Sequence, residues 1–159
     1  MRQKEEKKPD GIKIIATNRK ARYNYEILDT IEAGLSLVGS EVKSLRDGKA
    51  TLKDSYALSK YNELFLMNMH IPPYEKAGYS GHDPERPRKL LLHAKEIRKL
   101  ISMIDTKGIT LVPLKLYFRG KYAKMEIGIC KGKRSHDKRA AIKEREVKRD
   151  IEREFKSRH

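Results

Sequence analysis

Two neighbouring segments of this chain alternate between apolar and other residues, and this alternation constrains the fold more than any other feature. The segments are residues 110–118 and 123–129, and Gly120-Lys121 lies between them as a turn. A two-residue period predicts β-strands, and one apolar face on each strand is typical of an antiparallel sheet covered on one side. Pro113 lies in the first segment and cannot donate a ladder hydrogen bond, so it indicates an edge or a bulge.

The other periodic segments are short and are separated by turns. Apolar residues between 89 and 104 recur at helical spacing and predict an amphipathic helix, and residues 41–46 predict a short helix. Residues 71–88 hold four prolines and predict a long loop. Further strands are expected at 12–17, 23–31, 35–38, 52–59 and 64–70, with a break at 32–34. Six or seven short strands with two inserted helices predict a mainly β fold: a small closed antiparallel barrel of the oligonucleotide-binding type with peripheral helices.

Apolar residues are concentrated in the middle of the chain. Residues 12–130 hold 53 of the 60 apolar side chains, whereas residues 131–159 hold six and residues 1–11 hold only Met1. The middle part can therefore bury a core, and the two ends cannot build cores of their own. We expect a disordered leader over 1–11, one β-barrel domain over 12–130 and a basic tail over 131–159.

The charge of the chain points to its partner. Of the 159 residues, 37 are Lys or Arg and 22 are Asp or Glu, a formal net charge of +15. Residues 9–130 carry +7 of this excess and residues 131–159 carry +6. A thermophile-like surface would be rich in charges of both signs without so large an imbalance. Both parts are therefore expected to bind a polyanion, with nucleic acid as the leading candidate.

The tail sorts into rows when it is written as a helix from Ala140 onward. Arg145, Arg149 and Arg153 form a basic row, and Val147, Ile151 and Phe155 form a thin apolar row. Such a helix has little to bury and is marginal alone. One interpretation is a frayed, solvated helix. The interpretation we favour is a segment that becomes ordered on a negatively charged surface.

Several classes of protein are disfavoured. No segment approaches the roughly 20 apolar residues that span a bilayer, and the charged N-terminus lacks the apolar region of a secretion signal. Cys130 is the only cysteine, so an internal disulfide is impossible and a reducing, cytoplasmic compartment is expected. The sequence contains no phosphate-binding P-loop, no Gly-x-Ser-x-Gly motif of hydrolases and no His-Glu-x-x-His motif of zinc proteases. We expect neither an enzyme nor a bound metal, cofactor or small-molecule substrate.

Basic and aromatic residues lie together in two places. Lys and Arg neutralise phosphates and Tyr stacks on bases or riboses, although Tyr also occurs in strands for packing alone. The first cluster holds Arg19, Lys20, Arg22, Tyr23 and Tyr25, and the second holds Tyr117, Arg119, Lys121, Tyr122 and Lys124. The segment that holds Arg86, Arg88 and Lys89 adds cations beside the proline-rich loop. These clusters are candidate RNA contacts.

Glu32 needs separate treatment because a carboxylate repels phosphate. It is either a surface turn residue beside Gly34 or an acceptor of hydrogen bonds from bases or riboses in an irregular RNA. Sequence spacing leaves both interpretations open.

Six ordered motifs resemble one known family, the SsrA-binding proteins, also called small protein B. The resemblance runs from about Ile14 to the end of the chain. The motifs are NRKARYNY (18–25), EAGL (32–35), GSEVKSLRDGKA (39–50), DPERPRKLLLH (83–93), LVPLKLYF (111–118) and GKRSHDKR (132–139).

The resemblance implies an RNA-binding adaptor of trans-translation. Such a protein binds the tRNA-like domain of transfer-messenger RNA (tmRNA, or SsrA RNA) and delivers it to stalled bacterial ribosomes. Its tail occupies the decoding centre and the empty mRNA channel of the small subunit. We therefore expect tmRNA and small-subunit rRNA as partners, no membrane contact, and a monomer in the cytoplasm.

The resemblance also assigns residues. It gives roles in tmRNA binding to Asn18, Glu32 and Leu91, and we expect a buried Leu91 to act indirectly by shaping the surface. With the basic clusters, the predicted tmRNA contacts are Asn18, Arg19, Lys20, Arg22, Glu32, Arg88, Lys89, Leu91 and Lys124. The predicted ribosome contacts are Gly132, Lys133, Arg134, His136, Asp137, Lys138 and Arg139, followed by Arg145, Arg149 and Arg153.

Two other hypotheses remain open from the residues alone. A basic structural protein of the ribosome would have the same composition, and it would be present on every ribosome. A nuclease would need clustered carboxylates that hold a metal, and nothing in the spacing shows that Glu32, Glu41 and Asp54 converge.

Overall fold

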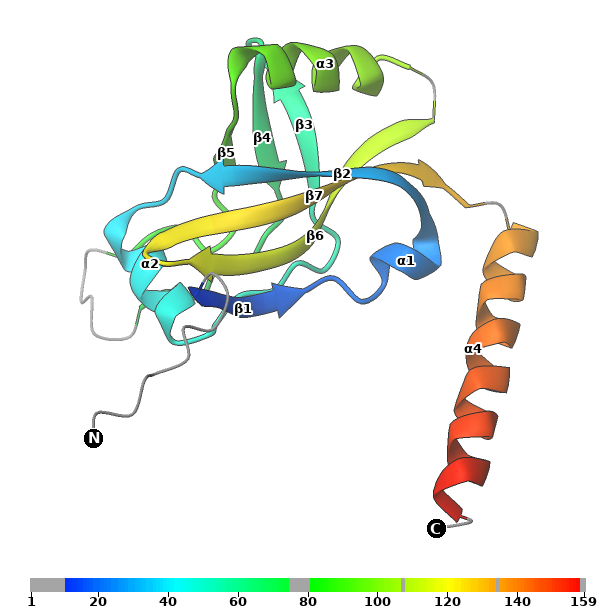
Figure 1. The fold of residues 1–159 in the computed structure, drawn as a ribbon. Helices are drawn as coiled ribbons and strands as arrows, with labels where there is room; N and C mark the ends of the chain where they lie inside the picture. The colour runs from blue at the N-terminus through cyan, green and yellow to red at the C-terminus, as the bar shows by residue number, and fades with distance from the viewer. Residues whose placement is uncertain (1–10, 75–80, 107, 134, 158–159) are drawn as a thin grey trace, which may run out of the picture.

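The computed structural model describes residues 11–74, 81–106, 108–133 and 135–157. Strands dominate it, and helices lie at the periphery (Figure 1). The strands are β1 (Ile12–Thr17), β2 (Tyr25–Leu35), β3 (Tyr56–Lys60), β4 (Glu63–Met67), β5 (Arg88–Leu91), β6 (Ile109–Arg119) and β7 (Tyr122–Gly132). The helices are α1 (Ala21–Asn24), α2 (Gly39–Arg46), α3 (Ala94–Ile104) and α4 (Ser135–Ser157). Of the predicted leader, only Gly11 lies within the described residues.

The strands close into a barrel. Neighbours follow the order β1-β6-β3-β4-β5-β2-β7, and β7 also pairs with β6. This last pairing closes a ring of six strands, while β1 pairs with β6 from outside that ring. All of these pairs are antiparallel. The prediction of a mainly β, closed antiparallel barrel with peripheral helices and a C-terminal helix is confirmed.

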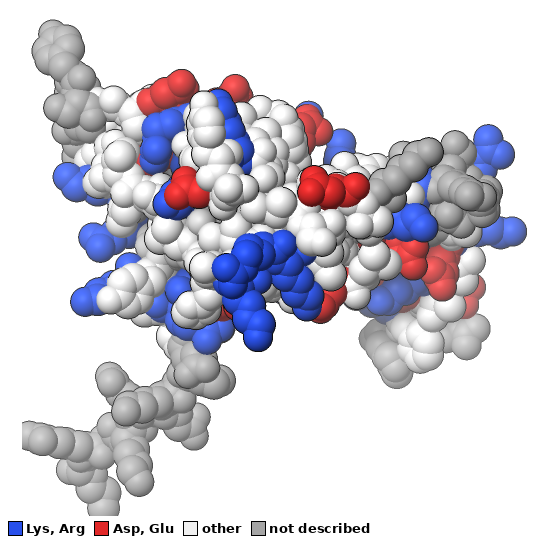
Figure 2. Space-filling view, turned by 90° about the horizontal axis from the view of Figure 1, so that it is seen from above, with Lys and Arg blue, Asp and Glu red and all other residues white. Residues whose placement is uncertain are grey.

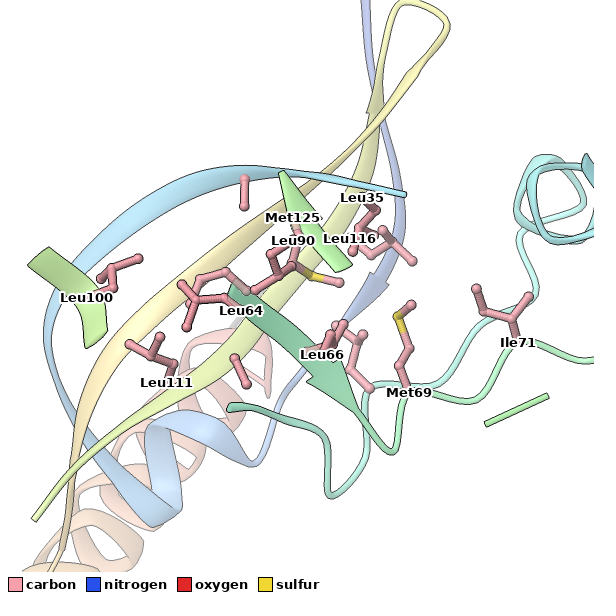
Figure 3. Packing of buried hydrophobic residues seen from close by; sticks show 14 of the residues in the cluster. Leu35, Leu64, Leu66, Met69, Ile71, Leu90, Leu100, Leu111, Leu116 and Met125 are labelled. Atoms are coloured by element: carbon pink, nitrogen blue, oxygen red, sulfur yellow. The ribbon is translucent and has the colours of Figure 1, made fainter. Parts of the chain in front are cut away.

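The barrel is filled by apolar side chains from its strands and from the helices that cover it (Figure 3). Leu64, Leu66, Leu111 and Met125 come from three of the strands and are fully buried. Leu100 reaches the same cluster from α3. Each buried Leu or Met stabilises the fold by about 1.5–3 kcal/mol relative to an exposed one. The ring therefore has a packed interior, and ligands have to bind on its outside or at its edges.

A bulge in β6 divides the apolar residues of that strand between two clusters. The register with β7 shifts between Pro113 and Lys115, which confirms the irregularity predicted at the proline. Leu111 and Leu116 face the barrel interior. Val112 and Leu114 instead form a second cluster outside it, with Ala21 of α1 and Cys130. α1 thus covers an apolar patch on the outer face.

Several predicted segments were wrong. The break expected at 32–34 and the separate strand expected at 35–38 do not exist, because β2 runs to Leu35 and ends, and its residues pair with β7 through Gly34. Residues 23–24, predicted as the start of a strand, belong to α1. The helix expected from residue 89 begins at Ala94, and the residues before it form β5. Leu90 has helical spacing to Ala94, but its side chain is buried in the barrel as a strand residue.

The helices occupy different places around the barrel. α3 lies across one end, whereas α2 and β1 lie toward the other end (Figure 1). α4 extends away from the barrel and lies beside α1. The helix begins at Ser135, five residues before the predicted start.

Candidate nucleic-acid interface

The outer face of β2, β7 and β6 carries most of the polar candidates. Glu32 lies opposite Glu126, Gly34 lies opposite Lys124, and Lys124 lies opposite Tyr117. Alternate residues of a strand share a face, and the residues between these ones enter the core. The fold thus joins three segments that are far apart in the sequence into one exposed surface.

Glu32 is held on this surface by two neighbours from β6. The Tyr117 hydroxyl donates a hydrogen bond to Glu32 Oε2, and Arg119 Nη2 lies 3.0 Å from the same oxygen. Burial, followed by the hydrogen bond and the charge of Glu32, raises the pKa of Tyr117 to about 12. The side chain of Glu32 is 37% exposed, and Oε1 has no partner among the described residues. This oxygen can accept a hydrogen bond from a base or a ribose.

Leu91 lies beside Glu32 and is exposed, so the expectation of a buried Leu91 was wrong. It ends β5, where Leu90 points into the core and Leu91 points outward, 49% exposed. It pairs with Gly34, and a Cβ on that glycine would lie only 3.2 Å from Leu91 Cβ. A shallow groove of about 270 Å³ runs here between Leu91, Tyr122 and Lys124. The leucine therefore offers apolar surface directly, beside an exposed tyrosine and a cation.

Asn18, Arg19 and Lys20 form a second group, on the connector between β1 and α1. Asn18 fastens the connector to β6: its backbone N–H donates to Leu114 O (2.8 Å) and its Nδ2 donates to Pro113 O (3.0 Å). Arg19 and Lys20 follow it in the turn and are exposed. Leu114, which Asn18 contacts, lies between Pro113 and Lys115, and these residues pair through β7 with Ile31 and Glu32 of β2, so the two groups are three interstrand spacings, roughly 15 Å, apart across the sheet. The predicted tmRNA contacts therefore form two groups, one on the connector beside β6 and one on β2, β5 and β7.

Arg88 does not belong to either group, which corrects its assignment as an RNA contact. Its side chain is fully buried, pairs with Glu41, and donates to the carbonyls of Met69 and Pro84. Each of the three guanidinium nitrogens thus donates a hydrogen bond inside the protein. Its neighbour Lys89 is about 41% exposed and forms an ion pair with Glu63 Oε1 at 2.7 Å.

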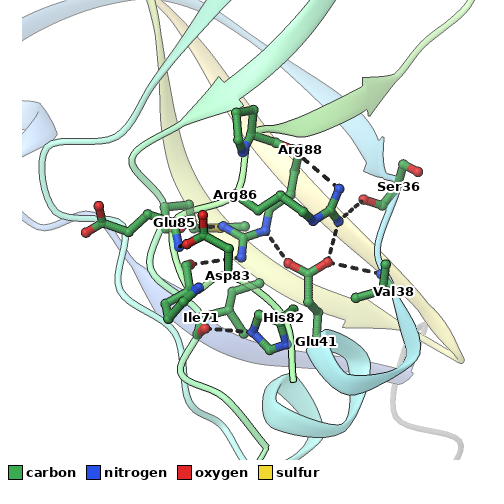
Figure 4. Close-up of polar contacts among 12 residues, drawn as sticks. Ser36, Val38, Glu41, Ile71, His82, Asp83, Glu85, Arg86 and Arg88 are labelled. Carbon is green, nitrogen blue, oxygen red and sulfur yellow. Dashed lines mark hydrogen bonds and ion pairs between the residues drawn. The ribbon is translucent and has the colours of Figure 1, made fainter. Parts of the chain in front are cut away.

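Glu41 is the centre of this buried network (Figure 4). It lies at the third position of α2, accepts from the Val38 N–H at 3.0 Å, and pairs with Arg86 and Arg88. Burial alone would raise the pKa of Glu41, but the hydrogen bonds from Arg86, Val38 and Arg88 outweigh it and hold the pKa below its usual value.

Further bonds join α2 to the proline-rich loop. Ser44 Oγ donates to Pro72 O at 2.7 Å, and the His82 ring lies 2.8 Å from both Ser40 Oγ and Ile71 O. The network therefore positions β5, and with it Leu91, relative to α2.

The charge on the barrel is arranged in patches. Seen from above, Lys and Arg side chains gather into a continuous patch in the middle of the face, whereas Asp and Glu lie in small separate groups (Figure 2). The helix at the edge of this view carries both signs. The patches match a phosphate backbone better than a compact anionic ligand.

Among residues 11–74, 81–106, 108–133 and 135–157, no group of three or more His, Cys, Asp or Glu side chains could hold a metal ion. None of the helices described has both the length and the apolar composition needed to cross a membrane.

The predicted ribosome contacts begin where β7 ends. Gly132 is the last residue of β7, and the Lys133 N–H donates to Asn24 O (3.1 Å) while its Nζ donates to Arg22 O (2.9 Å). The start of the tail is therefore hydrogen-bonded to α1, and the backbone carbonyl of Arg22 accepts one of these two bonds. Arg134 lies outside the described residues, as do the side chains of His136, Asp137 and Lys138, whose backbones form the first turn of α4.

The rest of α4 is exposed along its length. Arg145 lies 6.0 Å from the Tyr23 ring, and Arg153 approaches Asp150 at 4.0 Å with both side chains mostly in solvent. The predicted apolar row is uncovered, with Val147 52%, Ile151 50% and Phe155 69% exposed. Arg139 and Arg149 are exposed as well. The helix is free to dock on another surface.

Comparison with known families decides which family combines such a barrel and tail. The family described as SmpB protein matches residues 15–157, which include both. The chain belongs to the SmpB family. The resemblance stated from the motifs is thereby confirmed.

Individual relatives agree over most of their length. The SsrA-binding protein of Gloeothece citriformis is 54% identical over 145 residues, which cover 91% of this chain and 94% of that protein. The SsrA-binding protein of Microcystis aeruginosa is 54% identical over 148 residues, covering 92% and 96%. A solved SmpB structure, described as "tmRNA-SmpB: a journey to the center of the bacterial ribosome", matches with a TM-score of 0.65 and 50% identity, over 80% of this chain and 93% of that chain.

Sequence reasoning missed several residues of this SmpB-family surface. The sequence predicts Tyr117 and Arg119 only as possible RNA contacts, and their contacts with Glu32 depend on the pairing of β6 with β7 and of β7 with β2. The sequence predicts Gly34 in a turn. Its place opposite both Leu91 and Lys124 could have been found only from the register.

Proposed function

We propose that this chain is an RNA-binding adaptor of trans-translation in the bacterial cytoplasm. Its barrel, residues 12–130, binds the tRNA-like domain of tmRNA, and its tail, residues 131–159, enters the decoding centre and the empty mRNA channel of a stalled ribosome. The protein holds two RNAs together and performs no catalytic step of its own.

One observation carries the proposal: the chain presents two basic surfaces of different construction. The barrel offers Lys124, exposed Leu91 and the fixed carboxylate of Glu32 on a rigid sheet. The tail offers a long exposed helix that the barrel core does not use. The names of the relatives and the solved tmRNA complex of an SmpB protein support tmRNA as the first partner.

The proposed tmRNA contacts are Asn18, Arg19, Lys20, Arg22, Glu32, Lys89, Leu91 and Lys124. Arg88 is left out because it is buried, and Asn18 acts chiefly by fixing the connector on β6. These contacts come from the connector beside β6 and from strands β2, β5 and β7, so the RNA has to lie across several strands of the barrel. The proposed ribosome contacts are Gly132, Lys133, Arg134, His136, Asp137, Lys138, Arg139, Arg145, Arg149 and Arg153.

Deleting the tail tests whether the barrel and the tail bind different RNAs. Removing residues 131–159 should leave tmRNA affinity nearly unchanged in a filter-binding titration, because the residues of the barrel surface remain. The same deletion should abolish tagging of peptides on stalled ribosomes. A large loss of tmRNA affinity would contradict the two-site proposal.

Sequencing of the RNA that co-purifies with the full chain tests the identity of the partner. The expected result is enrichment of tmRNA. Equal recovery of ribosomal RNA from all ribosomes, with the protein at one copy per ribosome, would instead favour a structural ribosomal protein.

A further inference from the structure

A cavity opens where two strands share one edge of β6. β3 pairs with β6 at Leu111, and β1 pairs with it from Lys115 to Arg119. Between these points Asn18 donates hydrogen bonds to the carbonyls of Pro113 and Leu114. A cavity of about 580 Å³ remains there, bounded by the end of β1, the connector to α1 and the segment 50–56.

The walls of this cavity suit a planar, partly polar ligand. Ile15, Leu52 and Val112 provide apolar surface, and Tyr25 and Tyr56 provide rings, the latter 39% exposed. Hydroxyl and amide groups stand around them, on Thr17, Asn18, Asn24, Thr51 and Ser55. Nδ2 of Asn18 is used by Pro113 O, so its Oδ1 remains to accept a hydrogen bond.

Cations surround the entrance. Arg19, Lys20 and Lys53 line the cavity and are exposed, against one carboxylate, that of Asp54. No ion pair joins any of these four residues to another residue within the described ranges. Lys and Arg side chains placed in this way neutralise a phosphate.

The turn that carries Lys53 is fixed before any ligand arrives. The Ser55 N–H donates to Leu52 O at 3.2 Å, and its hydroxyl donates to the same oxygen. Asp54 adopts a left-handed backbone with φ of 58°, a turn conformation that Asp and Asn tolerate better than other residues with a side chain. A pre-formed site avoids the cost of ordering its walls when it binds.

We propose that this cavity holds one unstacked nucleotide of the bound RNA, with the base between the tyrosines and the phosphate among Arg19, Lys20 and Lys53. Its volume lies in the range of small-ligand pockets, roughly 300–1,000 Å³, so it admits a single nucleotide and excludes a duplex. The proposal rests on the proposed function, since the nucleotide belongs to the tmRNA that the barrel binds. It assigns a ligand class to a place where the sequence predicts a cluster of basic and aromatic RNA contacts but no cavity.

Filling the cavity tests this directly. Thr51 is exposed and lines the cavity, so Thr51→Trp should occupy the space without disturbing the core. Thr106→Trp is the matched control, an exposed threonine at the end of α3 that does not line it. In the full chain, Thr51→Trp should weaken tmRNA affinity by roughly tenfold or more, as loss of a stacked base does. Thr106→Trp should bind as the wild type does.

The phosphate contact has a separate readout. Lys53→Gln should reduce the slope of log affinity against log salt by about 1, because one fewer counterion is released. Lys60→Gln, on the exposed hairpin between β3 and β4, is the control that should leave the slope unchanged. Thermal unfolding of each variant checks that the fold is intact.

Titration with the four nucleoside 5′-monophosphates, followed by NMR of the full chain, separates the possible sources of the ligand. If the monophosphates shift the NMR signals of Asn18, Thr51 and Tyr56 but the chain binds no tmRNA, the cavity is a site for free nucleotides. In that case only the proposed function fails. If tmRNA binds and Thr51→Trp binds it as tightly as the control, the cavity proposal is overturned and the proposed function stands. If neither tmRNA nor any monophosphate binds, both fail.

Discussion

Glu32 is a carboxylate on a surface that is meant to meet phosphates, and its neighbours explain how it can be there. Arg119 offsets its charge, and Tyr117 holds one of its oxygens. The remaining oxygen is a fixed acceptor, which selects hydrogen-bond donors such as ribose hydroxyls and base amines and disfavours phosphates. The residue therefore contributes specificity, while the cations around it contribute affinity.

Glu32→Ala should weaken tmRNA binding by about tenfold, since a hydrogen bond to a charged group is worth on the order of 1.5 kcal/mol. Glu126→Ala is the matched control, because Glu126 lies directly opposite on β7 and its removal changes the net charge equally. A filter-binding titration measures both. Equal affinities for the two variants would remove Glu32 from the interface.

Cys130 should be unreactive in the folded protein. It is fully buried against Ala21 and Leu114 on the outer face of the barrel, and burial raises the pKa of its thiol to about 11. Only the thiolate reacts, so modification by a thiol reagent at neutral pH should be on the order of 100-fold slower than in the urea-unfolded chain. Fast modification of the native protein would mean that α1 does not stay docked on this patch.

At the scale of elements, the sequence predicted what depends on local pattern and failed where tertiary contacts decide. The hairpin of β6 and β7 could be predicted because both strands alternate over many residues. β5 could not, because four residues are too few for a periodic pattern and Leu90 fits a helix equally well. Its strand state follows from pairing with β4 and β2, which the sequence does not reveal.

The link between α2 and β5 should account for a large part of the stability of the fold. Glu41→Gln leaves the buried Arg88 without its counter-charge and should destabilise the protein by about 3–5 kcal/mol. Urea unfolding measures this loss. Glu63→Gln is the control, because its pair with Lys89 is partly exposed and should be worth about 0–1 kcal/mol.

The same carboxylate makes stability depend on pH in a defined direction. The pKa of Glu41 is lower in the folded state than its usual value of 4.5, so the unfolded chain binds its proton first as the pH falls. The contribution of Glu41 is therefore fully present above about pH 4.5 and is lost as the pH falls through the folded pKa. Unfolding curves below this pH should converge for the wild type and Glu41→Gln. Parallel curves over the whole acidic range would contradict this assignment.

For the whole molecule, the segmental charge predicted two basic parts, and the fold determined where their contacts lie. The motifs supplied Asn18, Glu32 and Leu91 together, and the register places Asn18 beside β6, on the far side of β7 from Glu32. Arg88 was misassigned because exposure cannot be read from a run of cations. A surface made from strands of distant sequence becomes visible only once the register is known.

The position of the positive charge, rather than its total, should decide which activity is lost. Arg149→Glu with Arg153→Glu reverses two exposed charges on α4, and Arg98→Glu with Lys99→Glu makes the same change on the exposed side of α3. If the tail meets rRNA, the α4 variant should lose tagging on stalled ribosomes by on the order of tenfold or more while it keeps tmRNA affinity within a few-fold. The α3 variant should keep most of its tagging activity, although its net charge is the same. Equal loss of tagging in both would show that the ribosome responds to the overall charge of the chain, and α4 would then have no specific site there.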